Sequence, residues 1–215
     1  MKYAIMTTQK RHFFVAFLGF SFLIFACTDT PKDTALPIIG ERQGIAANGD
    51  TIYPTIPDFS FTNQNNETVT NKTFEGKIYV ADFFFTHCPT ICPKVTAQML
   101  RLHEQFKDSA QLILLSHSID PKRDTIGRLK EYASKLGVDA PKWHFVTGNK
   151  EAVYGIADDY FSVAQENPTL PGGFDHSGRL ILIDKKRHVR AFCDGTDEKD
   201  VDRFMEDVKT LLRKN

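Results

Sequence analysis

The chain has 215 residues, a formal net charge of zero and 12% aromatic residues, most of them phenylalanine. The balanced charge gives no basis for a nucleic-acid partner, and the aromatic content argues against disorder. Once a leader is removed, the length allows one domain with a sizeable core.

The amino terminus has the pattern of an export signal. Lys2, Lys10 and Arg11 precede an apolar run over residues 13–26, and no acid appears before Asp29. We interpret residues 1–26 as a signal peptide, since the run is short for a membrane span. The run ends in "IFAC", which resembles a bacterial lipobox with its lipid on Cys27. The chain is therefore expected in the cell envelope, anchored to a membrane with its domain outside the cytoplasm.

A change of composition follows the leader. Residues 27–50 are rich in Thr, Pro, Asp and Gly without clear periodicity, which is typical of a flexible tether. Residues 51–215 are then expected to form the folded domain.

Regular patterns begin near residue 56. Continuous apolar runs predict buried strands, and apolar residues at helical spacing predict helices. In chain order the predicted elements are a hairpin in "FSFTNQNNETVT" turning at Asn65-Asn66, a strand at 77–85, a helix from 93, a strand at 111–119, a helix at 124–138 that stops at Gly137, a strand at 143–148, a helix at 150–160, strands at 179–184 and 188–195, and a helix at 197–214. This alternation predicts an α/β fold, with a central mixed sheet flanked by helices and an N-terminal hairpin extension.

Cys88 and Cys92 lie between the first buried strand and its helix. Sites tend to form there, at the carboxyl end of a strand in an α/β sheet. If Cys92 is in the first helical turn, the two thiols share a face, and the helix amino terminus lowers their pKa. Such a pair can bind a soft metal or close a disulfide, and the spacing alone does not decide. Its three-residue gap, against two in thioredoxin-type catalysts, leaves room for a metal, which would need a third ligand.

A histidine is the expected third ligand. His176 follows Gly172 and Gly173, which predict a mobile loop that can place an imidazole over the mouth of the sheet. His87 and His117 are weaker candidates. The remaining histidines are assigned to the leader, a solvent-facing helix position, or packed and surface positions in strands: His12, His103, His144 and His188.

Three blocks carry a family resemblance. "FFFTHCPTICPKV", "SHSIDPKRDT" and "DHSGRLILID" together resemble the Sco/SenC proteins, which are membrane-tethered, copper-binding and thioredoxin-like. Members of that family help to build the binuclear copper centre of cytochrome c oxidase. The resemblance places the copper ligands on Cys88, Cys92 and His176. Thiolates would hold Cu(I), and the imidazole would stabilise Cu(II).

Acids near these blocks are expected to have supporting roles. Asp175 is a candidate acceptor that orients the imidazole of His176. Asp120 is expected in a turn, and Asp124 as the cap of the following helix.

Two positions depart from the family pattern. Thr90 stands where many members have an acid, which removes a charge near the thiols. Cys193 stands where an aromatic residue is commoner, and it is expected to pack as a small hydrophobe.

The favoured reading is a copper metallochaperone that is not an enzyme. Its expected partners are a copper-receiving oxidase subunit, a thiol reductant, a copper donor and the membrane. The alternative is a thiol-disulfide oxidoreductase that keeps the cysteines of a copper-receiving partner reduced, with Cys88 and Cys92 catalytic. A peroxidase-like relative is a weaker reading, because the sequence shows no clear arginine partner. A purely structural disulfide would leave His176 without a role.

Overall fold

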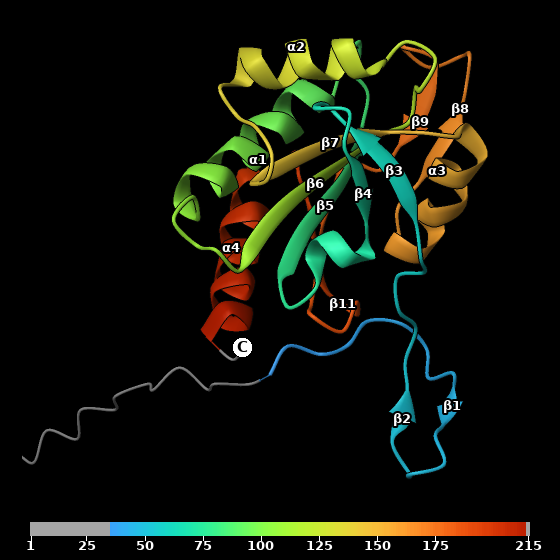
Figure 1. Ribbon diagram of the computed structural model, residues 1–215, viewed down its shortest axis with the longest axis vertical. Helices are drawn as coiled ribbons and strands as arrows, with labels where there is room; N and C mark the ends of the chain where they lie inside the picture. Colours follow the sequence, from blue (N-terminus) through green and yellow to red (C-terminus); the bar gives the residue numbers. More distant parts are fainter. Residues whose placement is uncertain (1–34, 214–215) are drawn as a thin grey trace, which may run out of the picture. The chain divides into compact units, whose positions relative to one another are not determined.

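Two parallel strands, β5 (Ile78–Phe84) and β6 (Leu112–Ser118), form the centre of the domain in this computed structural model, which describes residues 35–213 (Figure 1). Every residue of both strands is buried, as the apolar runs predicted. Cys193, on a strand at the edge of the same sheet, is 1% exposed and belongs to the hydrophobic core, in agreement with its interpretation as a packing residue.

The central sheet has seven strands and mixed pairing. Besides β5 and β6, the strands of the described residues, inside and outside this sheet, are β1 (Gly44–Ile45), β2 (Thr51–Ile52), β3 (Ser60–Asn63), β4 (Thr68–Thr70), β7 (Trp143–Thr147), β8 (Ala164–Glu166), β9 (Phe174–His176), β10 (Arg179–Ile183) and β11 (Val189–Asp194). The order in the large sheet is β11-β10-β5-β6-β7-β3-β4, in which β5, β6 and β7 are parallel and the other pairs antiparallel. The strands β1–β2 and β8–β9 form two separate hairpins.

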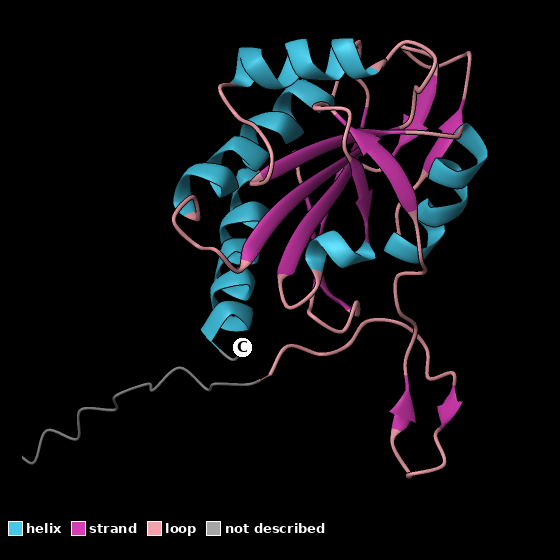
Figure 2. Ribbon diagram, viewed as in Figure 1, coloured by secondary structure: helices cyan, strands magenta, loops and turns pink. Residues whose placement is uncertain are grey.

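Helices cover both faces of this sheet (Figure 2). The helical segments are α1 (Cys92–Gln105), α2 (Ile126–Leu136), α3 (Lys150–Ala157), α4 (Glu198–Arg213) and the 3-10 turns η1 (Asn71–Phe74) and η2 (Asp158–Tyr160). Tyr132 of α2 packs on Phe84 with ring centroids 5.5 Å apart, whereas Tyr160 of η2 packs on Phe83 at 5.7 Å. Because successive side chains of a strand point to opposite faces, α2 and η2 lie on opposite sides of the sheet. The predicted mixed sheet with flanking helices is confirmed.

Several predicted boundaries shift in the structure. The helix predicted at 124–138 begins at Ile126, and Thr125 caps it by accepting the N–H of Arg128 at 3.3 Å. The prediction of Asp124 as the cap was therefore wrong. Gly137 ends the helix as predicted, with φ of 72°.

The predicted hairpin is present as β3–β4, and β3 also pairs with β7, so the hairpin forms one edge of the sheet. Part of the segment expected to be a tether is held against the other edge. The N–H of Ile39 donates to the carbonyl of Val189 at 2.8 Å, and Arg190 donates to the carbonyl of Pro37 at 2.9 Å. The predicted signal peptide and Cys27 lie outside the described residues. Within residues 35–213, no helix is both long and apolar enough to cross a membrane.

Candidate metal centre

The two motif cysteines lie where β5 ends and α1 begins. Cys92 is the first residue of α1, and Ile91 before it offers no side-chain cap to the exposed amides of the first turn. The sulfur of Cys88 instead accepts the N–H of Cys92, with 3.4 Å between Sγ and N. Pro93 needs no acceptor in this turn. The sulfur of Cys88 therefore lies at the amino terminus of α1 and takes the place of a side-chain cap.

His176 completes a three-donor cluster. Its Nε2 lies 3.2 Å from Cys92 Sγ and 3.9 Å from Cys88 Sγ, and the three donor atoms are all within 4.8 Å of one another. Cys92 is 4% exposed and Cys88 is 8% exposed. Gly172 and Gly173 lie in the turn of the β8–β9 hairpin, whereas His176 itself is on the strand β9, where it pairs with Ala164 of β8.

The β8–β9 hairpin is attached to the cysteine loop by close contacts. Gly172 approaches the ring of Phe85 so tightly that an added Cβ would lie 2.8 Å from it. Arg123 donates to the carbonyl of Gly172 at 3.3 Å, and its guanidinium lies 5.7 Å from the ring centroid of Phe174. Arg123 also pairs with Asp120, which lies in the turn after β6 as predicted. These contacts fix the distance between His176 and the thiols.

Asp124 joins the cysteine loop to β6. Its buried carboxylate accepts the N–H and the hydroxyl of Thr86, at 3.1 and 2.6 Å, and the hydroxyl of Ser118 at 2.6 Å. Arg128 of α2 donates to the Thr86 hydroxyl at 3.0 Å. Three donors, two of them on the partly buried Thr86, meet at one point where two strands end, and a carboxylate satisfies them all. This explains why Thr125 serves as the cap and Asp124 does not.

Asp175 does not orient the imidazole of His176. Its carboxylate accepts a hydrogen bond from Gln165 at 3.4 Å, and no hydrogen bond joins it to His176 in the described part of the chain. The ring of His176 instead packs edge-on against Phe85, with centroids 5.3 Å apart. Packing, more than hydrogen bonding, sets the orientation of this ring.

The other histidines are not ligands of this cluster. His117 is fully buried on the opposite face of the sheet, stacked on Phe83 at 5.0 Å, and burial lowers its pKa to about 3. His87 is exposed and its Nδ1 bonds to Thr86 at 3.1 Å. His103 is only partly exposed, so the prediction of a solvent-facing position was wrong. Among the described residues, His176 alone joins the two cysteines in a metal-binding group.

The cysteine pair shares one proton between two unequal sulfurs. The pKa of Cys88 is lowered, chiefly because the Cys92 thiol donates a hydrogen bond to its sulfur. The same bond and burial raise the pKa of Cys92. The backbone N–H of Thr90 also lowers the pKa of Cys88, and the Thr90 hydroxyl lies 3.6 Å from the same sulfur. The hydrogen bond between the two sulfurs therefore favours the thiolate at Cys88 and the thiol at Cys92.

Asp82 is a site-associated residue that the sequence reasoning missed. It is 3% exposed on β5, and burial raises its pKa to about 7, against the lowering effect of a hydrogen bond from Ser116. Its charge contributes to raising the pKa of Cys92, and His176 lowers the pKa of Asp82. The signal in the sequence was a lone acid within an apolar strand.

The donor set fits a soft metal. Two thiols and an imidazole suit copper(I), and the imidazole also suits copper(II). The same thiols are close enough for a redox-active dithiol, so the geometry permits both chemistries.

Comparisons with known proteins agree with this picture. A family model described as SCO1/SenC matches residues 49–213. A SCO1/SenC family lipoprotein from Bacillus anthracis is 30% identical, with a TM-score of 0.67 over 74% of this chain and 95% of that one. BsSco, a Sco family member described with a disulfide switch, is 25% identical, with a TM-score of 0.63 over 81% and 98%. Copper-bound ScoI from Arabidopsis thaliana is 26% identical, with a TM-score of 0.61 over 74% and 98%. The predicted thioredoxin-like fold is confirmed.

Proposed function

The chain belongs to the SCO1/SenC family, and from this premise we propose that it binds copper through Cys88, Cys92 and His176 and delivers it to the binuclear copper centre of cytochrome c oxidase. The supporting observation is the convergence of two thiols and one imidazole within 4.8 Å. Sco proteins with copper bound share the fold, and BsSco is described as belonging to a family of cytochrome c oxidase assembly proteins.

The cysteines and His176 would contribute differently to copper binding. Copper binding would displace the protons that remain on the two thiols, and the lowered pKa of Cys88 favours deprotonation of Cys88 before Cys92. His176 lies on a different element from the cysteines. An incoming ligand of the oxidase subunit can therefore replace the imidazole first, while both sulfurs stay bound.

An anaerobic copper titration of the reduced chain tests this proposal. We expect one retained copper after desalting, with a thiolate-to-copper(II) charge-transfer band on oxidation. His176→Ala and Cys88→Ser should lose it, and the matched control His87→Ala should keep it, since His87 bonds Thr86. An unchanged affinity and spectrum in His176→Ala would overturn the assignment.

A second function, thiol-disulfide exchange with a copper-receiving partner, is favoured by the low pKa of Cys88. The Cys88 thiolate would attack the partner disulfide and release one partner thiolate. Cys92 would then attack the Cys88 sulfur, closing a Cys88–Cys92 disulfide and releasing the second thiolate. Two electrons thus pass to the partner, and two protons are taken up by its thiols as needed. His176→Ala should retain this activity while losing copper, which separates the two functions.

The membrane anchor is a further part of the proposal. The "IFAC" segment supports lipidation at Cys27, and a lipoprotein from Bacillus anthracis has the same fold. Labelling of cells with a fatty-acid probe should mark the chain and fail in Cys27→Ser. Equal labelling of the two chains would contradict the assignment.

A further inference from the structure

A group of basic side chains lies far from the metal centre, around a cavity of about 310 Å³. Phe74 and Tyr79 form its apolar floor, and basic side chains of η1 and of the β10–β11 turn form its rim. The lining residues are Asn71, Lys72, Phe74, Glu75, Tyr79, Asp184, Lys185, Lys186 and Arg187.

Charge pairing leaves this rim positive. Arg187 pairs with Asp58 at 2.6 Å, and Asp184 is neutralised by Arg190 at 2.7 Å. No ion pair to Lys72, Lys185 or Lys186 is found within residues 35–213. Glu75 is the acid left to oppose these three lysines. We call this rim, defined by Lys72, Lys185, Lys186 and Arg187, the basic rim.

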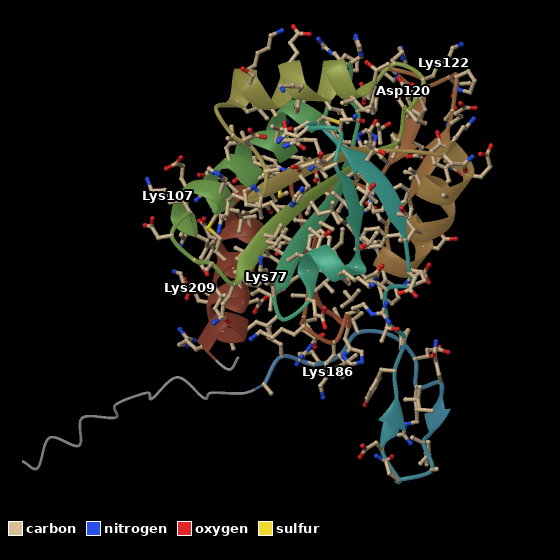
Figure 3. The ribbon with its side chains drawn as sticks, in the orientation of Figure 1. Lys77, Lys107, Asp120, Lys122, Lys186 and Lys209 are labelled. Carbon is tan, nitrogen blue, oxygen red and sulfur yellow. The ribbon has the colours of Figure 1, made fainter. Side chains whose placement is uncertain are left out.

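The basic rim is at the opposite end of the sheet from the copper ligands. Tyr79 is near the start of β5, and Phe85, which contacts His176, directly follows its end. At about 3.3 Å per residue, these positions are roughly 20 Å apart. Figure 3 shows Lys186 and Lys77 toward one end of the domain, and Asp120 and Lys122 toward the other.

The N-terminal segment joins the domain beside the basic rim. Arg190, just after the β10–β11 turn, holds the carbonyls of Leu36 and Pro37. Leu36 is nine positions after Cys27, so a lipid on Cys27 would keep this end of the domain within about 30 Å of the bilayer. The anchor therefore tethers the domain from the end that bears the basic rim.

The β1–β2 hairpin, which precedes the segment that contacts the β10–β11 turn, exposes two isoleucines. Ile45 and Ile52 of the β1–β2 hairpin are 66% and 42% exposed. The chain after β2 packs on the β10–β11 turn, where Ile56 donates to the carbonyl of Arg187 at 2.9 Å. Exposed isoleucines beside a basic surface fit the interface of a bilayer, where apolar side chains and lysines act together.

We propose that the basic rim and the β1–β2 hairpin dock on an anionic phospholipid surface. Lysines would bind headgroup phosphates, and Ile45 and Ile52 would enter the interface. Docking would direct Cys88, Cys92 and His176 away from the bilayer, toward a partner's exposed domain. This inference rests on the proposed anchor at Cys27 and is independent of copper.

The test uses the full chain reconstituted in vesicles of phosphatidylcholine alone or mixed with phosphatidylglycerol. Lysine accessibility is measured by amine labelling and mass spectrometry at low and high salt. We expect several-fold protection of Lys72, Lys185 and Lys186 in anionic vesicles only, reversed by salt. Two exposed lysines, Lys122 at the other end of the domain in Figure 3 and Lys130 on α2, should label equally throughout.

Charge-reversed variants sharpen the result. Lys185→Glu with Lys186→Glu should abolish the protection of Lys72, and the matched pair Lys122→Glu with Lys130→Glu should preserve it. Equal labelling in the two vesicle types would overturn the proposal, as would equal protection by soluble glycerol phosphate without vesicles. Cosedimentation with both vesicle types shows separately whether the lipid on Cys27 anchors the chain. Copper retention by the same variants shows whether the proposed copper site is intact.

Discussion

Nε2 of His176 lies 3.2 Å from Sγ of Cys92, although 84 residues separate them in the sequence. The cysteines belong to the start of α1, and the histidine belongs to a small hairpin outside the main sheet. The ligand set therefore depends on how that hairpin is attached to the cysteine loop. Contacts remote from the donor atoms should control metal affinity.

Gly172 provides the sharpest test of this attachment. In Gly172→Ala the new Cβ would meet the Phe85 ring at 2.8 Å and Pro89 at 3.1 Å, so the hairpin must shift and carry His176 with it. We expect copper affinity to fall by about tenfold or more, the equivalent of about 1.4 kcal/mol. Competition with a copper chelator measures the change.

Gly173→Ala is the matched control. Its φ of +87° equals the +88° of Gly172 within a degree, so both substitutions carry a similar backbone cost of about 1 kcal/mol. No atom lies within 4 Å of the Cβ added at position 173, so copper affinity should be preserved. Equal losses in the two variants would show that backbone strain, and not the Phe85 contact, sets the affinity.

Cys92→Ala should raise the pKa of Cys88 toward the ordinary thiol value near 8.5. The Cys92 thiol is the main cause of the low pKa, because it donates to the Cys88 sulfur. Cys92→Ser should give an intermediate pKa, since a hydroxyl can also donate. The pH dependence of alkylation of Cys88 measures this, and buried Cys193, whose pKa is raised, should not interfere. A Cys88 pKa that stays low in Cys92→Ala would refute the shared-proton description.

The elements of the main sheet could be predicted because their signals are local. Apolar runs marked β5 and β6, and Gly137 marked the end of α2. The β8–β9 hairpin escaped prediction because its three-residue strands are partly exposed and are held by tertiary contacts such as that of Gly172 with Phe85.

The donor residues could be named from motifs, but their supports could not. Asp124 looked like a helix cap, since its acceptor role depends on Thr86 and Ser118, which are distant in sequence or on another element. Asp82 sat within an apolar strand, and only the packed sheet shows that it is buried beneath the cysteines with Ser116 as its donor. Such roles arise from convergence of strands, which a linear pattern does not record.

Asp82 should make the stability of the domain depend on pH. Burial raises its pKa from 3.8 to about 7, so between these values the folded chain holds a proton that the unfolded chain has lost. Stability contributed by this group therefore falls as pH rises from about 4 to 7 and is constant above. In Asp82→Asn this loss disappears, so the variant should be more stable than the parent at pH 8, by up to about 4 kcal/mol, and similar to it near pH 3. Urea unfolding across this range measures the difference, and parallel curves for the two chains would contradict the assignment.

Asp124→Ala should destabilise the domain and loosen the cysteine loop. The change removes the carboxylate that accepts from the N–H and hydroxyl of the partly buried Thr86 and from the hydroxyl of the buried Ser118. At about 1 kcal/mol or more for each lost partner, we expect a loss of about 3 kcal/mol or more in the free energy of unfolding. Asp158→Ala, at an exposed position after α3, is the control and should change stability by less than about 0.5 kcal/mol. Urea unfolding gives the free energies, and copper retention below the unfolding transition shows whether the loop still holds its ligands. If Asp124→Ala were as stable as the control, water would have to replace the carboxylate, and the proposed link between β6 and the cysteine loop would be wrong.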